Sequence, residues 1–418
     1  MNGFIINKER LEQRIKDLSL FGMNQVGGID RSIGSEADKK ARKWLIDLFE
    51  EQLKAKVKID PIANIWANVD GSESLAPITI GSHHDAVPSG GKFDGALGVL
   101  LGVEVVERII EEGYELRHPL QIVSFSAEEP NPFNLSTLGS RISTGKISKE
   151  EVKKAVNKDN GILLSDALAE IGGNADILED ARLKPGDMSA FIECHIEQGR
   201  ILFDRKLSVA AVKKVTGIYR EEITVLGEAN HAGTTLMKYR HDSLLAASEA
   251  CLELEKIIVE INRNDVVGTV GKLNVYPNSA NIIPASIEFI LEIRTPSTEI
   301  KNEIIEKFSL SFKAIEEKRG VKFDRKIILN QAEVNMDETV VKALEASIEE
   351  ISEPLVDMVS MAGHDSVHMT DICKTAMLFV QSIDGKSHCA DENTKMDDIE
   401  KAGNVLLRTI LKLDKELD

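Results

Sequence analysis

Cysteine is scarce in this chain, and its scarcity bears on where the chain folds. The 418 residues include four cysteines, and none of them stands in a paired C-x-x-C spacing. Disulfide-built folds depend on closely paired cysteines and belong to oxidising compartments. We therefore expect a reducing, cytoplasmic setting, in which Cys194 and Cys389 are small buried residues beside a histidine rather than thiolate ligands.

Long apolar runs are missing as well. No stretch approaches the roughly 20 consecutive apolar residues that a membrane helix needs. The N-terminal stretch MNGFIINKERLEQRIKDL is charged and amphipathic, and it lacks the continuous apolar centre of a signal peptide. We expect neither a membrane partner nor a secretion signal.

Positive charge is in deficit. Lysine and arginine number 51 against 69 aspartates and glutamates, which gives a net charge of −18. Such a balance argues against nucleic acid and anionic membranes as partners. Hydrophobic residues make up 42% of the chain, as in an ordinary soluble globular protein, and its length allows two domains with a sizeable core.

The first 130 residues alternate between short apolar strands and amphipathic helices. This alternation predicts an α/β fold, with a mostly parallel sheet flanked by helices. Functional residues then belong at the carboxyl ends of the strands. Helices are expected at 7–22, at 36–54 with Ser35 as its N-cap, and at 97–112. Strands are expected at 56–59, 64–69, 77–80 and 120–126.

After about residue 211 the pattern changes. Residues 217–226 alternate apolar and polar side chains, as a half-exposed antiparallel strand does. A helix, two strands, a second helix and a further strand follow, in the β-α-β-β-α-β order of a ferredoxin-like domain. We therefore predict an inserted α+β domain at 212–327, and a catalytic domain assembled from residues 1–211 and 328–418.

The stretch Ile78–Gly95 holds the first candidate site. It delivers His83, Asp85 and Asp94 from a strand end into a glycine-rich loop, where Gly90-Gly91 is expected to permit a sharp turn. In a strand His83 and Asp85 share a face while His84 points the other way. Imidazole and carboxylate are good ligands for zinc, manganese or cobalt.

Further candidate ligands stand near the ends of later strands. Glu128 and Glu129 are adjacent after the strand at 120–126, so one can ligate a metal while the other acts as a base. Taken alone, each histidine would be a hydrogen-bonded strand-end residue. Taken together, five side chains could hold two metals about 3.5–4 Å apart with one bridging carboxylate. These five are His83, Asp94, Glu129, His195 and His388.

Eight motifs between Gly81 and Glu392 resemble one family. The chain is similar to the dinuclear metallohydrolases related to aminoacylase and carboxypeptidase G. It more closely resembles their carbamoylase branch, which includes N-carbamoyl-L-amino-acid hydrolases, β-ureidopropionase, allantoate amidohydrolase and ureidoglycolate amidohydrolase. The motifs are GSHHDAVPSGGKFDGALGV, EEPNPF…LGSR, HIEQG, NHAGTT, PNSANIIP, IRTP, AGHD and GKSHCADE.

The resemblance implies a role for each candidate ligand. His83 and His195 would bind one metal, Glu129 and His388 the other, and Asp94 would bridge them. Two divalent ions are implied, drawn from zinc, manganese, cobalt and nickel. The resemblance leaves open which of these is native.

Roles in catalysis and substrate binding follow from the same resemblance. Asp85 would orient His83, and Glu128 would be the general base on a metal-bound water. His231 resembles a histidine that crosses the interface of a homodimer to stabilise the oxyanion, so the resemblance implies that the inserted domain is a lid and dimerisation domain. Four further residues would bind or lie near the substrate: Gln198, Asn281, Arg294 and His364.

The implied activity is hydrolysis of the carbamoyl C–N bond by attack of metal-bound hydroxide. The small-molecule substrate would be an N-carbamoyl amino acid, allantoate or ureidoglycolate. An aminoacylase or dipeptidase on the same core, and a non-catalytic binding protein, are the alternatives. Three departures from the branch bear on substrate choice: Pro130-Asn131-Pro132-Phe133 in place of an arginine-containing motif, Glu292 in place of aspartate, and Leu236 in place of proline.

Overall fold

The computed structural model describes residues 4–418, which form two compact units. Unit 1 takes the described residues up to Lys213, with Met336–Met358 and His364–Asp418, and unit 2 takes Lys214–Asn335 with Val359–Gly363. The expected domain end at residue 327 falls inside a strand of unit 2, Lys322–Asn330. Among the described residues no helix is long and apolar enough to span a membrane.

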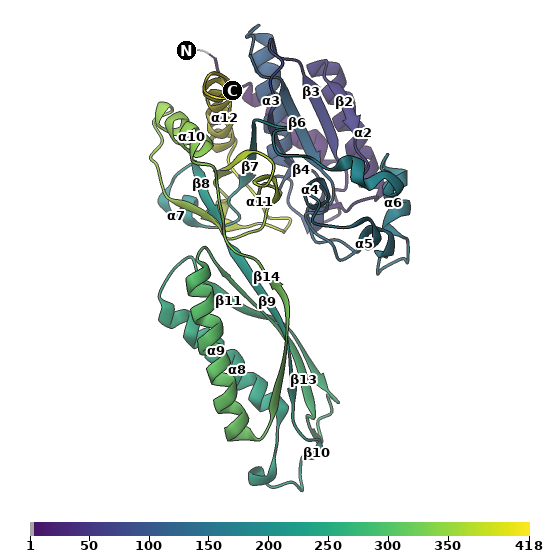
Figure 1. Ribbon diagram of the computed structural model, residues 1–418, viewed down its shortest axis with the longest axis vertical. Coiled ribbons are helices and arrows are strands. Elements are labelled where there is room, and N and C mark those ends of the chain that lie inside the picture. The colour runs from purple at the N-terminus through teal and green to yellow at the C-terminus, as the bar shows by residue number, and fades with distance from the viewer. Residues whose placement is uncertain (1–3) are drawn as a thin grey trace. The chain divides into compact units, whose positions relative to one another are not determined.

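Unit 1 confirms the α/β class (Figure 1). Its strands are β1 Ile29–Arg31, β2 Lys56–Ile59, β3 Ile65–Val69, β4 Ile78–His83, β5 Ala86–Gly90, β6 Leu120–Phe125, β7 Ala190–Ile196, β8 Val209–Val215 and β17 Lys374–Val380. Its α-helices are α1 Lys8–Ser19, α2 Glu36–Leu53, α3 Ala96–Glu111, α4 Leu138–Ser143, α5 Lys149–Lys154, α6 Leu164–Glu170, α7 Ile201–Arg205, α10 Glu338–Glu350, α11 Ser366–Met369 and α12 Met396–Glu416. Two 3-10 turns complete it, η1 Ala175–Ala181 and η3 Ile383–Gly385.

The main sheet has a parallel centre. Strands β17, β7, β4 and β6 lie side by side and parallel, whereas β3, β2 and β8 pair antiparallel at its flanks. Short strands β15 Val334–Asn335 and β16 Met358–Ser360 pair with β8. Every residue of β4 and β7 is buried, as expected of parallel strands covered on both faces. The carboxyl ends of the parallel strands therefore open on one edge of the sheet.

Local signals explain the helix that begins at the predicted cap. The Ser35 hydroxyl accepts a hydrogen bond from the backbone N–H of Asp38 at 3.1 Å, which satisfies a free donor in the first turn of α2. Leu45 and Phe49 on this helix are fully buried. The expected helix at 36–54 is confirmed at Glu36–Leu53.

The prediction of a sharp turn at Gly90-Gly91 is wrong, because Gly90 ends a strand. Residues Ala86–Gly90 make a strand that pairs antiparallel with β1, and it is Ser89, at φ 52°, that takes the left-handed conformation. The two glycines are needed for space. A Cβ on Gly90 would lie 2.9 Å from the Val87 carbonyl oxygen, and one on Gly91 would lie 1.9 Å from the Glu392 carboxyl group.

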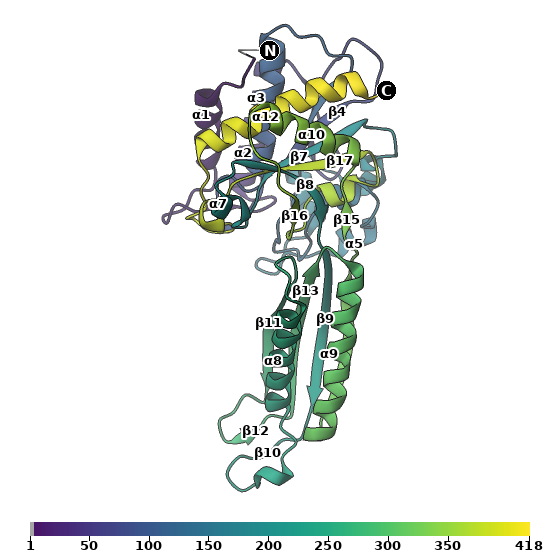
Figure 2. The same cartoon turned by 90° about the vertical axis from the view of Figure 1, so that its left-hand side faces the viewer.

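Unit 2 is a four-stranded antiparallel sheet in the order β11-β13-β9-β14. Helices α8 and α9 pack together on one face of it, and the side chains between them and the sheet form a separate core (Figures 1 and 2). That this unit acts as a lid or dimerisation domain stays a prediction. Its elements are β9 Gly217–Leu226, β10 Asn230–His231, η2 Met237–Tyr239, α8 Ser243–Ile261, β11 Val267–Tyr276, β12 Ile282–Ile283, β13 Ser286–Thr295, α9 Thr298–Arg319 and β14 Lys322–Asn330.

Candidate metal centre

The four parallel strands of unit 1 each contribute to one cluster of side chains. Strand β4 ends at His83, β7 carries His195 near its end, and β6 runs directly into the segment with Glu128 and Glu129. Strand β17 leads through η3 to His388. Because these strands are neighbours and parallel, their carboxyl ends bring residues far apart in sequence to one edge.

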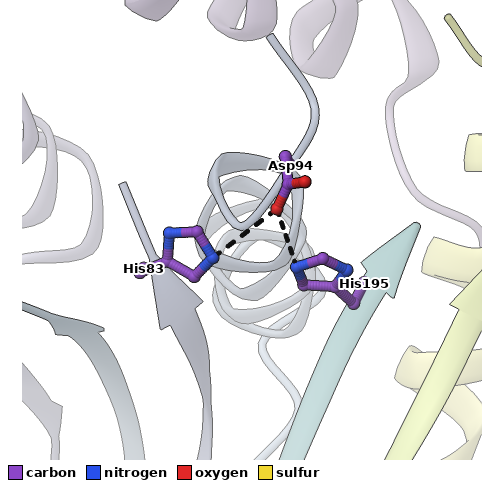
Figure 3. A group of neighbouring side chains, drawn as sticks. All are labelled: His83, Asp94 and His195. Carbon is purple, nitrogen blue, oxygen red and sulfur yellow. Dashed lines mark ion pairs between the residues drawn. The ribbon is translucent and has the colours of Figure 1, made fainter. Parts of the chain in front are cut away.

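His83, Asp94 and His195 form the first group. Asp94 Oδ1 lies 3.1 Å from His195 Nε2 and 3.7 Å from His83 Nε2, so the carboxylate stands between the two rings (Figure 3). All three side chains are buried, and one ligand atom from each lies within 4.8 Å of the others. Two imidazoles and a carboxylate are a donor set that suits a divalent transition metal.

Hydrogen bonds fix which ring nitrogens face Asp94. His195 Nδ1 lies 2.9 Å from the Ile196 carbonyl oxygen, and His83 Nδ1 lies 3.2 Å from the Asp85 carbonyl oxygen. A carbonyl oxygen can only accept, so each Nδ1 carries the proton and donates it. The Nε2 atoms that face Asp94 are then the ones able to bind a metal, as is usual for metal histidines.

Asp85 ties this group to the two glutamates. Its carboxylate accepts from the backbone N–H groups of Glu128, at 3.2 Å, and Glu129, at 3.1 Å. Its Oδ1 also lies 3.4 Å from His83 Nδ1. One buried carboxylate therefore connects the end of β4 with the segment that follows β6.

Asp94, Glu129 and His388 form the second group. His388 Nε2 lies 3.3 Å from Asp94 Oδ2 and 3.3 Å from Glu129 Oε1. Glu129 Oε1 is buried and accepts no hydrogen bond, so the His388 ring is its neighbour of opposite charge in this group. A metal cation would lower the cost of burying this oxygen further. The two groups share Asp94 through its two different oxygens, which suits a bridging ligand.

The buried charges of the centre shift one another strongly. Burial works against ionisation of Asp94, but the surrounding histidines, His195 foremost, hold its pKa well below the usual value. Burial raises the pKa of Glu129 to about 7, and it raises that of Glu128 well above the usual value. The hydrogen bond to Asp94 raises the pKa of His388 to about 9. Cations placed among these carboxylates would relieve their mutual repulsion.

Glu392 was not singled out from the sequence, although the motif GKSHCADE contains it. Its Oε1 accepts from the backbone N–H groups of Phe93, at 3.0 Å, and Asp94, at 3.1 Å. Its Oε2 lies 3.1 Å from the hydroxyl of Ser387, which donates to Asp94 Oδ2 at 2.8 Å. Glu392 thus fastens the loop of Asp94 to the loop of His388, and Gly91 leaves the room for it.

His84 is turned away from the centre, as the strand alternation predicts. Its Nε2 lies 2.8 Å from Asp38 Oδ1 and its Nδ1 lies 2.6 Å from the hydroxyl of Ser124. Arg42 pairs with the same Asp38 oxygen at 2.9 Å. This buried network secures the end of β4 behind His83.

His364 lies against the first group. Its ring meets that of His195 edge to face, with centroids 4.6 Å apart. Glu193 completes a third cluster with these two histidines. The Glu193 carboxylate, however, accepts from the Ser82 hydroxyl and from the Ser366 N–H, each at 2.8 Å, so its oxygens already have donors.

Three of the predicted residues lie in unit 2. His231 is exposed, and its Nδ1 accepts from the N–H groups of Gly233, at 3.0 Å, and Thr234, at 3.1 Å. Asn281 is exposed in the segment before β12 and accepts from the Ser279 hydroxyl at 2.8 Å. Arg294 on β13 donates to Glu292 at 2.7 Å and to the Met361 carbonyl oxygen at 2.8 Å.

Comparison with known proteins gives consistent matches along the chain. Residues 79–412 match the model of peptidase family M20/M25/M40. The N-carbamoyl-L-amino acid amidohydrolase of Geobacillus stearothermophilus is 34% identical over 411 residues, which cover 98% of this chain and 99% of that protein. The ureidoglycolate hydrolase of Arabidopsis thaliana is 33% identical over 409 residues, which cover 96% and 86%. A solved amidase of the hydantoinase/carbamoylase family from Burkholderia multivorans matches with a TM-score of 0.89 and 29% identity, covering 98% of each chain.

Gly95 offers a test of the first group. It has φ 61°, and a Cβ there would lie 2.2 Å from the His83 ring, whereas Gly113, at φ 63°, has nothing within 4 Å of its Cβ position. We expect Gly113→Ala to lose about 1–2 kcal/mol of stability from its positive φ. Gly95→Ala should lose more, because φ 61° with ψ −52° lies outside the left-handed helical region and the new Cβ meets the His83 ring. Only Gly95→Ala should also lose bound metal, as measured by elemental analysis. Equal metal content in the two variants would contradict this placement of His83.

Proposed function

Because the chain belongs to peptidase family M20/M25/M40, we propose that it is a dinuclear metal-dependent amidohydrolase that cleaves the carbamoyl C–N bond of a small ureido compound. The observation that carries this proposal is the pair of ligand groups that share Asp94 through different oxygens. The similarity to an N-carbamoyl-L-amino acid amidohydrolase and to a ureidoglycolate hydrolase supports the bond type. The cytoplasmic location stays a prediction.

Each ligand group would hold one divalent ion. His83, His195 and Asp94 Oδ1 would bind the first, and Asp94 Oδ2, Glu129 and His388 the second. When bound, such ions supply Lewis-acid polarisation of a carbonyl group and make a water molecule more acidic. Nitrogen and oxygen donors of this kind suit zinc, manganese, cobalt and nickel.

Glu128 is the proposed general base. It is adjacent to a ligand but belongs to neither group, and its Oε2 lies 3.7 Å from His83 Nε2. A buried carboxylate with a raised pKa takes a proton from the attacking water more readily than an exposed one, and can pass it to the leaving nitrogen. Asp85 accepts a hydrogen bond from the Glu128 backbone N–H and so fixes the main chain that carries this carboxylate.

His231 is the proposed oxyanion donor. Because its Nδ1 accepts two backbone hydrogen bonds, the neutral ring carries its proton on Nε2 and can donate it. We propose that it serves the site of the partner subunit in a homodimer. Support for self-association comes from α8, where Leu245, Leu252 and Val259 are exposed at seven-residue intervals, and from β11, which lies at the sheet edge.

Arg294 and Asn281 are the proposed anchors for the substrate carboxylate. The guanidinium of Arg294 is oriented through Nε by Glu292 and through Nη1 by the Met361 carbonyl oxygen. A planar guanidinium held in this way is suited to grip a carboxylate. N-carbamoyl amino acids, allantoate and ureidoglycolate all carry that group.

Ammonia release tests the proposed activity. Metal-loaded protein should release ammonia from at least one member of a panel of N-carbamoyl-L-amino acids, allantoate and ureidoglycolate, and chelation should abolish the release. Dipeptides and N-acetyl amino acids serve as the comparison panel. Cleavage of that panel alone would favour the aminoacylase or dipeptidase alternative.

Substitution of each adjacent glutamate should distinguish the role of the base from that of the metal ligand. Glu128→Gln keeps the shape of the side chain but cannot accept a proton, so kcat should fall about 10²–10⁴-fold with metal content unchanged. Glu129→Gln is the matched control and should lose metal from the second group. Loss of metal from the Glu128 variant instead would exchange the two roles.

Subunit mixing tests the position of His231. A heterodimer of one His231→Ala chain and one Glu128→Gln chain has one site with an intact Glu128 and an intact His231 from its partner. We expect about half of the wild-type activity, whereas each mutant homodimer should lose roughly 10²-fold or more. Heterodimers purified by two different tags that remain inactive would show that His231 does not act across an interface.

A further inference from the structure

Gln198 stands at the second ligand group. Its side-chain nitrogen lies 2.7 Å from Asp94 Oδ2, 3.2 Å from His388 Nε2 and 3.3 Å from the Ser387 hydroxyl. Asp94 Oδ2 and His388 Nε2 are two of the atoms assigned above to the second ion. The resemblance gave Gln198 a place in the substrate pocket, but in this structure its amide turns toward the ligands.

The main chain of Gln198 is held in place. Its backbone N–H donates to the hydroxyl of Ser382 at 3.0 Å, and the residue has φ 58°, a conformation that few residues other than glycine adopt. Gly199 and Arg200 connect it to α7, which starts at Ile201. We therefore expect a change in the position of the amide to come from rotation of the side chain.

The amide nitrogen of Gln198 and a metal cation would compete for the same side of Asp94 Oδ2. A glutamine NH₂ group is a donor with no lone pair to offer a metal. Its hydrogen bond to an ionised carboxylate is of the strong, charge-assisted kind. Among the described residues, the side-chain donors to Asp94 other than histidines, Gln198 and Ser387, are both directed at Oδ2, while Oδ1 faces His83 and His195.

We propose that Gln198 competes with the second metal ion. Its amide lies on the donor side of Asp94 Oδ2, and binding of the second ion there would displace it. This inference rests on the dinuclear site of the proposed function. Two consequences follow: the second group loads more weakly than the first, and the amide becomes available to a substrate only after the second ion is in place.

Metal titration of Gln198→Leu tests the competition. Leucine is close to glutamine in size but cannot donate a hydrogen bond. Co²⁺ would be added to metal-free protein and followed by calorimetry and by visible absorption, with stoichiometry from elemental analysis. We expect the Kd of the second ion to fall about tenfold, since one charge-assisted hydrogen bond no longer has to be broken, and the Kd of the first ion to stay within about twofold.

Ser387→Ala is the matched control. Its hydroxyl donates to the same Asp94 oxygen at 2.8 Å, but it also lies 3.1 Å from Glu392 Oε2 and positions the loop of His388 beside Asp94. It should leave the second Kd unchanged or raise it. A tenfold fall in Ser387→Ala as well would mean that loss of any donor to Asp94 has the effect, which would overturn a specific role for Gln198.

A second variant, Gln198→Gly, tests the same competition if Gln198→Leu does not fold. Gln198→Gly removes the amide and also relieves the left-handed backbone, so it should tighten the second ion in the same direction. An unchanged or weakened second Kd in the folded variants overturns the competition while leaving the dinuclear site intact. If wild type and both variants bind one ion or none, the proposed dinuclear function fails together with it.

Discussion

The structure of the centre depends on one buried carboxylate that faces two ways. Asp94 Oδ1 lies toward His83 and His195, and its Oδ2 lies toward His388, Ser387 and Gln198. A carboxylate with 4% of its surface exposed would be costly to ionise without such partners. Because both ligand groups need this one side chain, an error in its position affects both at once.

Two further carboxylates hold the loops around Asp94 in register. Asp85 joins the end of β4 to the backbone of Glu128 and Glu129, and Glu392 joins the backbone of Phe93 and Asp94 to Ser387. Each accepts hydrogen bonds from main-chain N–H groups, which do not depend on a flexible side chain. The proposed ligands are thus fixed by hydrogen bonds from the backbone to these carboxylates. The bonds to Glu392 join segments more than 290 residues apart.

Much of the fold and of the candidate metal centre could be predicted from the sequence, because strand periodicity and short motifs are local features of it. The alternation of apolar and polar residues predicts strand β9 and the opposite directions of His83 and His84. The five proposed ligands, chosen from the sequence, lie in two clusters in the structure. Contacts between distant segments gave no such signal. Glu392 was overlooked, and Gly91 was explained by backbone freedom although its function is to leave space for that glutamate. The position of the Gln198 amide likewise depends on the loop of Ser387, which meets it only in the folded chain.

The segment after Glu129 departs from the similar branch but keeps its own support. Its sequence Pro130-Asn131-Pro132-Phe133 lacks the arginine of the similar branch, yet Asn131 donates to the Glu129 carbonyl oxygen at 3.1 Å and accepts from Phe133 N–H at 3.0 Å. The loop is therefore closed by its own amide side chain. This closure holds the backbone next to Glu129 without an arginine, so the departure from the similar branch leaves a proposed ligand supported. That the departure alters substrate choice stays a prediction.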